Sequence, residues 1–111
     1  MNTAMTTIRL LCAALLAAAL PAMASSGDAE VGKKKSAPCA ACHGANGVSA
    51  SPDFPNLAGQ YPDYLVTAMS HYQNGKRKNA IMQAQVAKLT TKDKMDLAAY
   101  FSSQKALAVK H

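Results

Sequence analysis

The sequence is short and basic. Its 111 residues argue for one domain, and 12 Lys and Arg against 6 Asp and Glu give a formal net charge of +6. With no Trp, four Tyr and two Phe, a chain of this size buries only a thin core unless something staples it. The composition therefore favours a small domain completed by a large apolar group, and the lack of interleaved aromatic residues disfavours nucleic-acid binding.

Residues 1–24 have the pattern of a secretory signal peptide. A short polar start leads into the apolar run Leu10–Leu20, and residues 22–24 (AMA) supply the small-x-small pattern of a cleavage site. The run is shorter than the roughly 20 residues of a membrane-spanning helix, and Cys12 lies at its start, not after it as in a lipoprotein. We expect cleavage, a single domain over residues 25–111, and a periplasmic location.

The first half of that domain is predicted to hold one helix and one long loop. Residues 28–36 (DAEVGKKKS) read as a helix with acidic residues in its first turn. Pro38 is predicted to end this helix, because proline restricts the residue before it. A loop rich in Gly, Ser, Asn and Pro follows over residues 45–59. Loops of this length are uncommon in small domains and usually functional, so something must hold this one.

The second half is predicted to be helical. Residues 62–74 begin with proline, are followed by glycine and carry apolar residues at helical spacing. A short helix is expected over residues 83–89, and the last helix over residues 92–104, capped by Thr90 or Thr91. No segment alternates as a strand would, and there is no internal repeat. The predicted fold class is all-α, with three main helices plus a short one.

The segment Cys39–His43 (CAACH) carries the strongest chemical signal. Cys-x-x-Cys-His is a pattern of c-type haem attachment. Two thiols one helical turn apart each reach a vinyl group of the porphyrin, and the histidine that follows lies beneath the iron as its proximal ligand. Because Cys12 leaves with the signal peptide, Cys39 and Cys42 are the only cysteines of the mature chain.

Three other interpretations of the cysteine pair are weaker. A thioredoxin-like redox pair needs a βαβ context, which this sequence lacks. A structural zinc site needs four ligands, and the other histidines, His71 and His111, lack zinc-finger spacing. A disulfide between Cys39 and Cys42 would close a tiny loop and constrain little, and it would leave His43 unexplained.

The iron needs a second axial ligand or an open position. Met82 lies in a stretch expected to be irregular, which is able to fold across the haem face opposite His43, so position favours it. Met69 lies on the apolar face of its helix and Met95 lies inside the last helix, so core packing is the default for both. His71 lies off that apolar face and is expected to be exposed. A filled position indicates electron transfer, and an open one indicates sensing or catalysis.

Four blocks resemble, in order, those of small bacterial class I cytochromes c. They are residues 39–44 (CAACHG), 55–60 (PNLAGQ), 75–82 (GKRKNAIM) and 97–104 (LAAYFSSQ). The chain is similar to the single-haem c553 type and to one half of the dihaem c4 type. The Arg-x-Asn-x-x-Met pattern of the third block is more discriminating than Cys-x-x-Cys-His. Because a c4 protein has two haem motifs and this sequence has one, the c553 type fits better.

The resemblance implies a class I cytochrome c fold wrapped around one covalent haem c, attached through the two cysteines. It implies axial ligation of the iron by His43 and Met82. It also implies that the carbonyl of Pro55 accepts a hydrogen bond from Nδ1 of His43, which fixes the ring and raises its basicity. Leu57 is implied to pack on the haem.

Three further positions take roles from the same resemblance. Arg77 is implied to lie near a haem propionate, and Asn79 is implied to brace the methionine segment. The first helix is implied to cross the last, with Gly32 allowing a close approach to Tyr100 or Phe101.

The predicted function is periplasmic one-electron transfer by a monomer that is not an enzyme. Implied partners are membrane respiratory complexes upstream and a terminal oxidase or periplasmic reductase downstream, met in weak, salt-sensitive encounters. The basic residues 76–78 are expected to steer the protein to acidic partners, and residues 33–35 to be solvated surface. The alternatives are a haem c subunit of a periplasmic dehydrogenase complex and an open-iron haem sensor or peroxidase.

Overall fold

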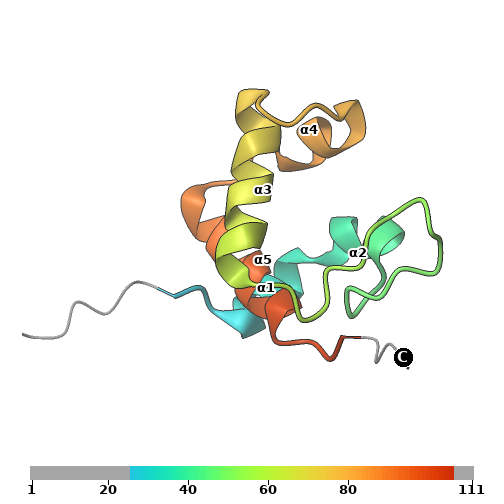
Figure 1. The fold of residues 1–111 in the computed structure, drawn as a ribbon. Coiled ribbons are helices and arrows are strands. Elements are labelled where there is room, and N and C mark those ends of the chain that lie inside the picture. The colour runs from blue at the N-terminus through green and yellow to red at the C-terminus, as the bar shows by residue number, and fades with distance from the viewer. Residues whose placement is uncertain (1–25, 107–111) are drawn as a thin grey trace, which may run out of the picture.

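The computed structural model describes residues 26–106, and five helices lie in that part of the chain (Figure 1). They are α1 (Ala29–Lys35), α2 (Ala37–His43), α3 (Pro62–Asn74), α4 (Ala80–Val86) and α5 (Thr91–Ser102). Residues 26–106 contain no strand, which confirms the all-α class. None of the helices described there is long and apolar enough to cross a membrane. The predicted signal peptide lies outside the described residues.

Helices α1 and α5 cross in close contact, and Gly32 is what permits it. A Cβ added at Gly32 would lie 1.9 Å from the backbone oxygen of Asp96 and 2.9 Å from Cβ of Tyr100. The predicted approach of Gly32 to Tyr100 is therefore confirmed. Asp28 begins α1, because its carboxylate accepts hydrogen bonds from two backbone N–H groups of the first turn.

Pro38 has a different effect from the one predicted. Helix α1 ends at Lys35, and Pro38 lies in the first turn of the next helix, α2. Proline is tolerated there because the first N–H groups of a helix have no partner within the helix. The Cys-x-x-Cys-His segment thus forms a helix of its own, and the expected set of three main helices plus a short one was one helix too few.

Helix α3 covers the predicted residues, whereas α4 starts earlier than predicted. The short helix was expected over residues 83–89 and is found at Ala80–Val86. Asn79 is the reason, since its Oδ1 accepts the backbone N–H of Met82 at 3.0 Å and caps the helix. Met82 therefore lies in the first turn of a helix and not in an irregular stretch.

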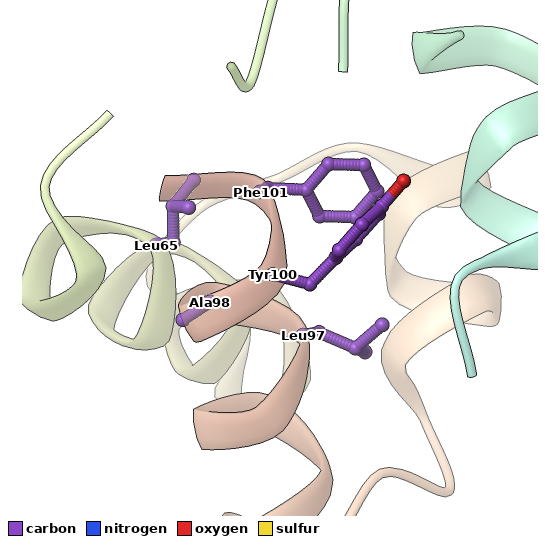
Figure 2. Packing of buried hydrophobic residues seen from close by; sticks show 5 residues of the cluster. All are labelled: Leu65, Leu97, Ala98, Tyr100 and Phe101. Carbon is purple, nitrogen blue, oxygen red and sulfur yellow. The ribbon is translucent and has the colours of Figure 1, made fainter. Parts of the chain in front are cut away.

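Helix α5 supplies most of the hydrophobic core. Thr90 and Asp93 start the helix with a reciprocal capping box. The buried cluster in Figure 2 joins α5 to α3 and consists of Leu65, Leu97, Ala98, Tyr100 and Phe101. The two aromatic rings of this cluster lie 5.0 Å apart at 56°. This core is small, as the composition predicted.

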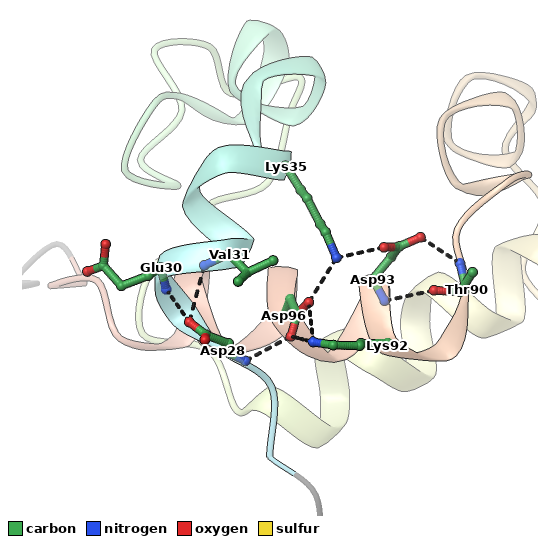
Figure 3. Close-up of polar contacts among 8 residues, drawn as sticks. All are labelled: Asp28, Glu30, Val31, Lys35, Thr90, Lys92, Asp93 and Asp96. Atoms are coloured by element: carbon green, nitrogen blue, oxygen red, sulfur yellow. Dashed lines mark hydrogen bonds and ion pairs between the residues drawn. The ribbon is translucent and has the colours of Figure 1, made fainter.

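A buried carboxylate ties α1 to α5 (Figure 3). Asp96 is fully buried. It accepts hydrogen bonds from the backbone N–H of Asp28 at 2.8 Å and from the ammonium groups of Lys35 at 2.8 Å and Lys92 at 2.9 Å. These donors, the Asp28 N–H first, hold the pKa of Asp96 well below its usual value. The expectation that residues 33–35 are all solvated surface is therefore wrong for Lys35.

Candidate functional site

Helix α2 presents the two cysteines and the histidine together. Cys39 and Cys42 are half-buried, free thiols, and a spacing of three residues makes them neighbours on one helix face. His43 is the last residue of the helix and is only 7% exposed. Burial raises the pKa of the Cys39 thiol above its usual value. This thiol is thus protonated at neutral pH.

The His43 ring is held in one orientation. Its Nδ1 lies 2.7 Å from the carbonyl oxygen of Pro55, which is the contact that the resemblance implied. The edge of Phe54 also packs against the ring, with centroids 6.5 Å apart at 67°. Because Nδ1 donates to the carbonyl, Nε2 is the nitrogen left for a metal, and the hydrogen bond makes it a stronger ligand.

The long loop between α2 and α3 is held by protein hydrogen bonds. The carbonyl of Gly47 accepts the N–H groups of Leu57 at 2.7 Å and Ala58 at 3.0 Å. The hydroxyl of Tyr100 donates to the carbonyl of Ala45 at 2.6 Å and so ties the loop to α5. These contacts place the Pro55 carbonyl beside His43, and none of them was evident from the sequence.

A cavity of about 440 Å³ lies among α2, α3, α4, α5 and the long loop. Its size falls in the range of about 300–1,000 Å³ typical of ligand and cofactor sites. All eight residues that the sequence singled out line it: Cys39, Cys42, His43, Pro55, Leu57, Arg77, Asn79 and Met82. Much of the remaining lining is apolar and includes four members of the core cluster: Leu65, Leu97, Ala98 and Phe101.

The four candidates for a second axial ligand separate clearly. Met82 and Met69 line the cavity, whereas His71 and Met95 do not. Met95 lines a separate hollow beside Gly27, and His71 is partly buried, not exposed as expected. Met69 packs against the core cluster. Among these candidates, Met82 is thus the methionine that lines the cavity without packing against the core cluster.

Arg77 is held at the cavity by two tyrosines. Its guanidinium carbon lies 4.9 Å from the centre of the Tyr72 ring, as in a cation–π contact, and its Nη1 donates to the hydroxyl of Tyr64 at 3.3 Å. A guanidinium matches the geometry of a carboxylate. The arrangement makes Arg77 available to an acidic group of a molecule bound in the cavity.

Sequence reasoning missed two polar residues that join the helices around the cavity. Gln73 of α3 donates two hydrogen bonds to backbone carbonyls at the end of α4 and just after it. Lys94 of α5 is buried and donates to Gln73. The available signal was weak, because polar residues within amphipathic helices are usually solvated.

The cavity residues fit a covalently attached haem. Two neighbouring thiols, a buried imidazole with Nε2 available and a thioether all line one largely apolar cavity. An imidazole and a thioether together are the iron ligands of electron-transfer cytochromes c.

Comparison with known proteins agrees with this chemistry. The family model of cytochrome c oxidase, cbb3-type, subunit III matches residues 21–101. Cytochrome c4 of Pseudomonas aeruginosa is 45% identical over 98 residues, which cover 87% of this chain and 49% of that protein. Cytochrome c-554(548) of Halomonas halodenitrificans is 42% identical over 82 residues, which cover 71% of this chain and 99% of that protein.

Solved structures agree as well. The crystal structure of reduced recombinant cytochrome c4 from Pseudomonas stutzeri superimposes with a TM-score of 0.69 at 43% identity, covering 72% of this chain and 47% of that one. This confirms the predicted class I cytochrome c fold. A more distant relative, the thiosulfate dehydrogenase electron acceptor of Thiomonas intermedia, is 35% identical over 72 residues, 64% of this chain and 33% of that protein. The chain spans about half the length of the cytochromes c4 it matches.

Proposed function

The chain belongs to the c4-like cytochrome c family, and from this premise we propose that it is a periplasmic one-electron carrier with a single haem c. The observation that carries the proposal is the convergence of two thiols, one imidazole and one thioether on the same apolar cavity. The haem iron would supply the redox chemistry by cycling between its ferric and ferrous states.

Cys39 and Cys42 are proposed as the attachment points and His43 as the proximal ligand. Their place on one short helix, α2, supports this, because a rigid helix sets the spacing of the three side chains. The hydrogen bond from Nδ1 of His43 to Pro55 keeps the ring from rotating and favours binding through Nε2.

Met82 is proposed as the distal ligand. It reaches the cavity from α4, and Figure 1 shows α4 and α2 on the same side of α3. Asn79 braces Met82 by accepting its backbone N–H at 3.0 Å. A methionine ligand raises the reduction potential relative to other axial choices. If both side chains stayed bound in both oxidation states, little would reorganise when an electron moves.

The other cavity residues would position the haem. Leu57 is proposed to pack on the porphyrin, since it lines the cavity and contacts the core cluster. Arg77 is proposed to neutralise a propionate, because the two tyrosines already hold its guanidinium at the cavity. Burial of the haem in this apolar lining would further disfavour the more positive oxidised state.

Partners and location follow from the same proposal. The signal-like residues 1–24 favour export to the periplasm, and the exposed basic residues 76–78 favour acidic docking surfaces on redox proteins. We propose a monomer that meets its partners transiently, with an affinity that falls as salt rises. Upstream membrane complexes and a downstream oxidase or periplasmic reductase are the proposed partner classes.

A second candidate role is that of a haem subunit in a periplasmic dehydrogenase complex. The relative named as a thiosulfate dehydrogenase electron acceptor favours it. The two roles differ in partner affinity, so the state of the protein on purification separates them. A complex that survives moderate salt would favour the subunit, and a free monomer would favour the carrier.

The test of the proposed function is a ligand-binding spectrum of the reduced periplasmic protein with and without carbon monoxide. The wild type should keep its haem after denaturation and show the methionine–iron charge-transfer band when oxidised. When reduced, it should not bind carbon monoxide. Met82→Ala should lose that band and bind carbon monoxide, because it opens the sixth position. Met95→Ala is the matched control outside the cavity and should behave as the wild type. Carbon monoxide binding by the wild type would overturn the proposed role as an electron carrier and would favour an open-iron sensor.

A further inference from the structure

The interior contains a lysine that has no carboxylate partner among residues 26–106. Lys94 of α5 is 8% exposed. Its Nζ donates to Oγ of Ser70 at 2.9 Å and to Oε1 of Gln73 at 2.8 Å, both on α3. Within residues 26–106 no carboxylate lies within ion-pairing distance of this ammonium group. A buried charge is costly unless it is well hydrogen-bonded, so these two neutral acceptors must stay in place.

Gln73 links three helices through its side-chain amide. Its Oε1 accepts from Lys94, and its Nε2 donates to the carbonyl of Val86 at 2.7 Å and to that of Leu89 at 2.8 Å. A primary amide has two N–H donors, and both are used here. The ammonium group fixes which end of the amide faces α5, so the N–H groups are turned towards the end of α4.

These contacts matter because α4 is weakly anchored by packing. Val86 is its only buried residue, and Ile81 is 61% exposed. The last carbonyls of a helix have no partner within the helix. The Val86 carbonyl accepts both the side-chain amide of Gln73 at 2.7 Å and the backbone N–H of Leu89 at 3.1 Å. At the other end Asn79 caps the helix through the N–H of Met82. The helix that carries Met82 is thus held at each end by a side-chain amide.

We propose that Gln73, oriented by the buried ammonium of Lys94, is a positioning residue that holds α4 against α3 and so keeps Met82 on the iron. This role rests on the proposed function, in which Met82 is the distal ligand. Gln73 acts from the far end of α4 and does not line the cavity. Loss of its two donors would let α4 move and would raise the fraction of molecules in which Met82 has dissociated.

The test is a titration of the oxidised haem-loaded protein with imidazole at fixed pH, followed by the methionine–iron charge-transfer band. Imidazole binds only when Met82 has left, so its apparent affinity scales with the open fraction. Gln73→Leu keeps the size of the side chain and removes the donors. Losing two hydrogen bonds should raise the apparent imidazole affinity about tenfold. Gln83→Leu, an exposed position on α4, is the matched control and should leave the affinity unchanged.

Two further variants test separately the hydrogen bonds that Gln73 donates and the orienting effect of Lys94. Gln73→Glu still accepts from Lys94 and cannot donate to the carbonyls of Val86 and Leu89, so it should match Gln73→Leu. A wild-type imidazole affinity in Gln73→Glu would overturn the proposed donors. Lys94→Met removes the orienting ammonium and should shift the affinity in the same direction, and no shift would overturn the orienting role of Lys94.

The thermal stability of each variant is measured beside its imidazole affinity. A purely structural role for Gln73 would lower the melting temperature and leave the imidazole affinity unchanged, and this result would overturn the proposal. Failure of the underlying function looks different, because the wild type itself would then lack the charge-transfer band. Loss of the band on imidazole addition to the variants at lower concentration than in the wild type is the supporting result.

Discussion

Replacing Gly32 by alanine should destabilise the protein through the crossing of α1 and α5. The new Cβ would meet the backbone oxygen of Asp96 at 1.9 Å, the backbone carbon of that residue at 2.6 Å and Cβ of Tyr100 at 2.9 Å. The first two obstacles are backbone atoms, which cannot rotate away as the end of a flexible side chain does. The two helices must therefore separate by about 1 Å, which is a large displacement for close-packed elements.

The size of the effect follows from two opposing terms. Alanine in a helix interior is more favourable than glycine by about 1 kcal/mol. Overpacking a core costs about 1–3 kcal/mol. We expect the upper end of this range for Gly32→Ala, because the obstacle is the backbone of Asp96, a fully buried residue. The net loss in the free energy of unfolding is about 2 kcal/mol. For a domain of this size, that corresponds to a fall in Tm of about 8–16 °C.

Thermal unfolding of the haem-loaded protein, followed by circular dichroism, measures this loss. Lys34→Ala on the same helix is the control, because Lys34 is exposed and its replacement should change Tm little. Gly75→Ala separates backbone strain from steric overlap. Gly75 has a positive φ of 79°, but no atom lies within 4 Å of its added Cβ. If Gly32→Ala unfolded at or above the wild-type temperature, the predicted clash with Asp96 would not be costly, and the reasoning from the close crossing of α1 and α5 would be refuted.

Two further predictions concern single polar contacts. Lys35 holds the pKa of Asp93 at about 2, so the stability that Asp93 contributes is complete above its unfolded pKa of about 4 and is lost as the pH falls towards 2. Between about pH 5 and 2, the Tm of Lys35→Met should therefore fall less steeply with decreasing pH than the Tm of the wild type. Equal slopes of Tm against pH would contradict the pairing of Lys35 with Asp93. Tyr100→Phe should lose about 1 kcal/mol, and about 4–8 °C in Tm, because it removes the hydroxyl that donates to Ala45 at 2.6 Å. Tyr61→Phe alters a residue that is 78% exposed and should leave Tm unchanged, and equal effects of the two would argue against the Tyr100 contact.

Local patterns predicted most of the helices correctly, and the two errors have separate causes. The boundaries of α3 agree because proline at its start and glycine after its end act locally. Pro38 predicts a helix stop but lies in the first turn of α2, since proline both disfavours a helical conformation of the residue before it and suits the first helical turn. Helix α4 was placed three residues late because the cap formed by Asn79 was not recognised.

The candidate site was predicted from the sequence alone. The spacing of two cysteines and a histidine predicts covalent haem attachment, because one helical turn sets the distances between the three side chains. The resemblance to cytochromes c implied roles for the remaining predicted residues in their order along the chain. It also indicated the contact between His43 and the Pro55 carbonyl, which is 2.7 Å long.

The tertiary structure was needed to show which methionines line the cavity and what contacts each of them. Met69 and Met82 both line the cavity, but Met69 packs against the core cluster while Met82 lies on α4. The hydrogen bond from Lys94 to Gln73 joins residues 21 positions apart in the sequence, and no local pattern reveals it. Such contacts depend on how helices pack in space, and packing brings together residues whose separation along the chain carries no signal.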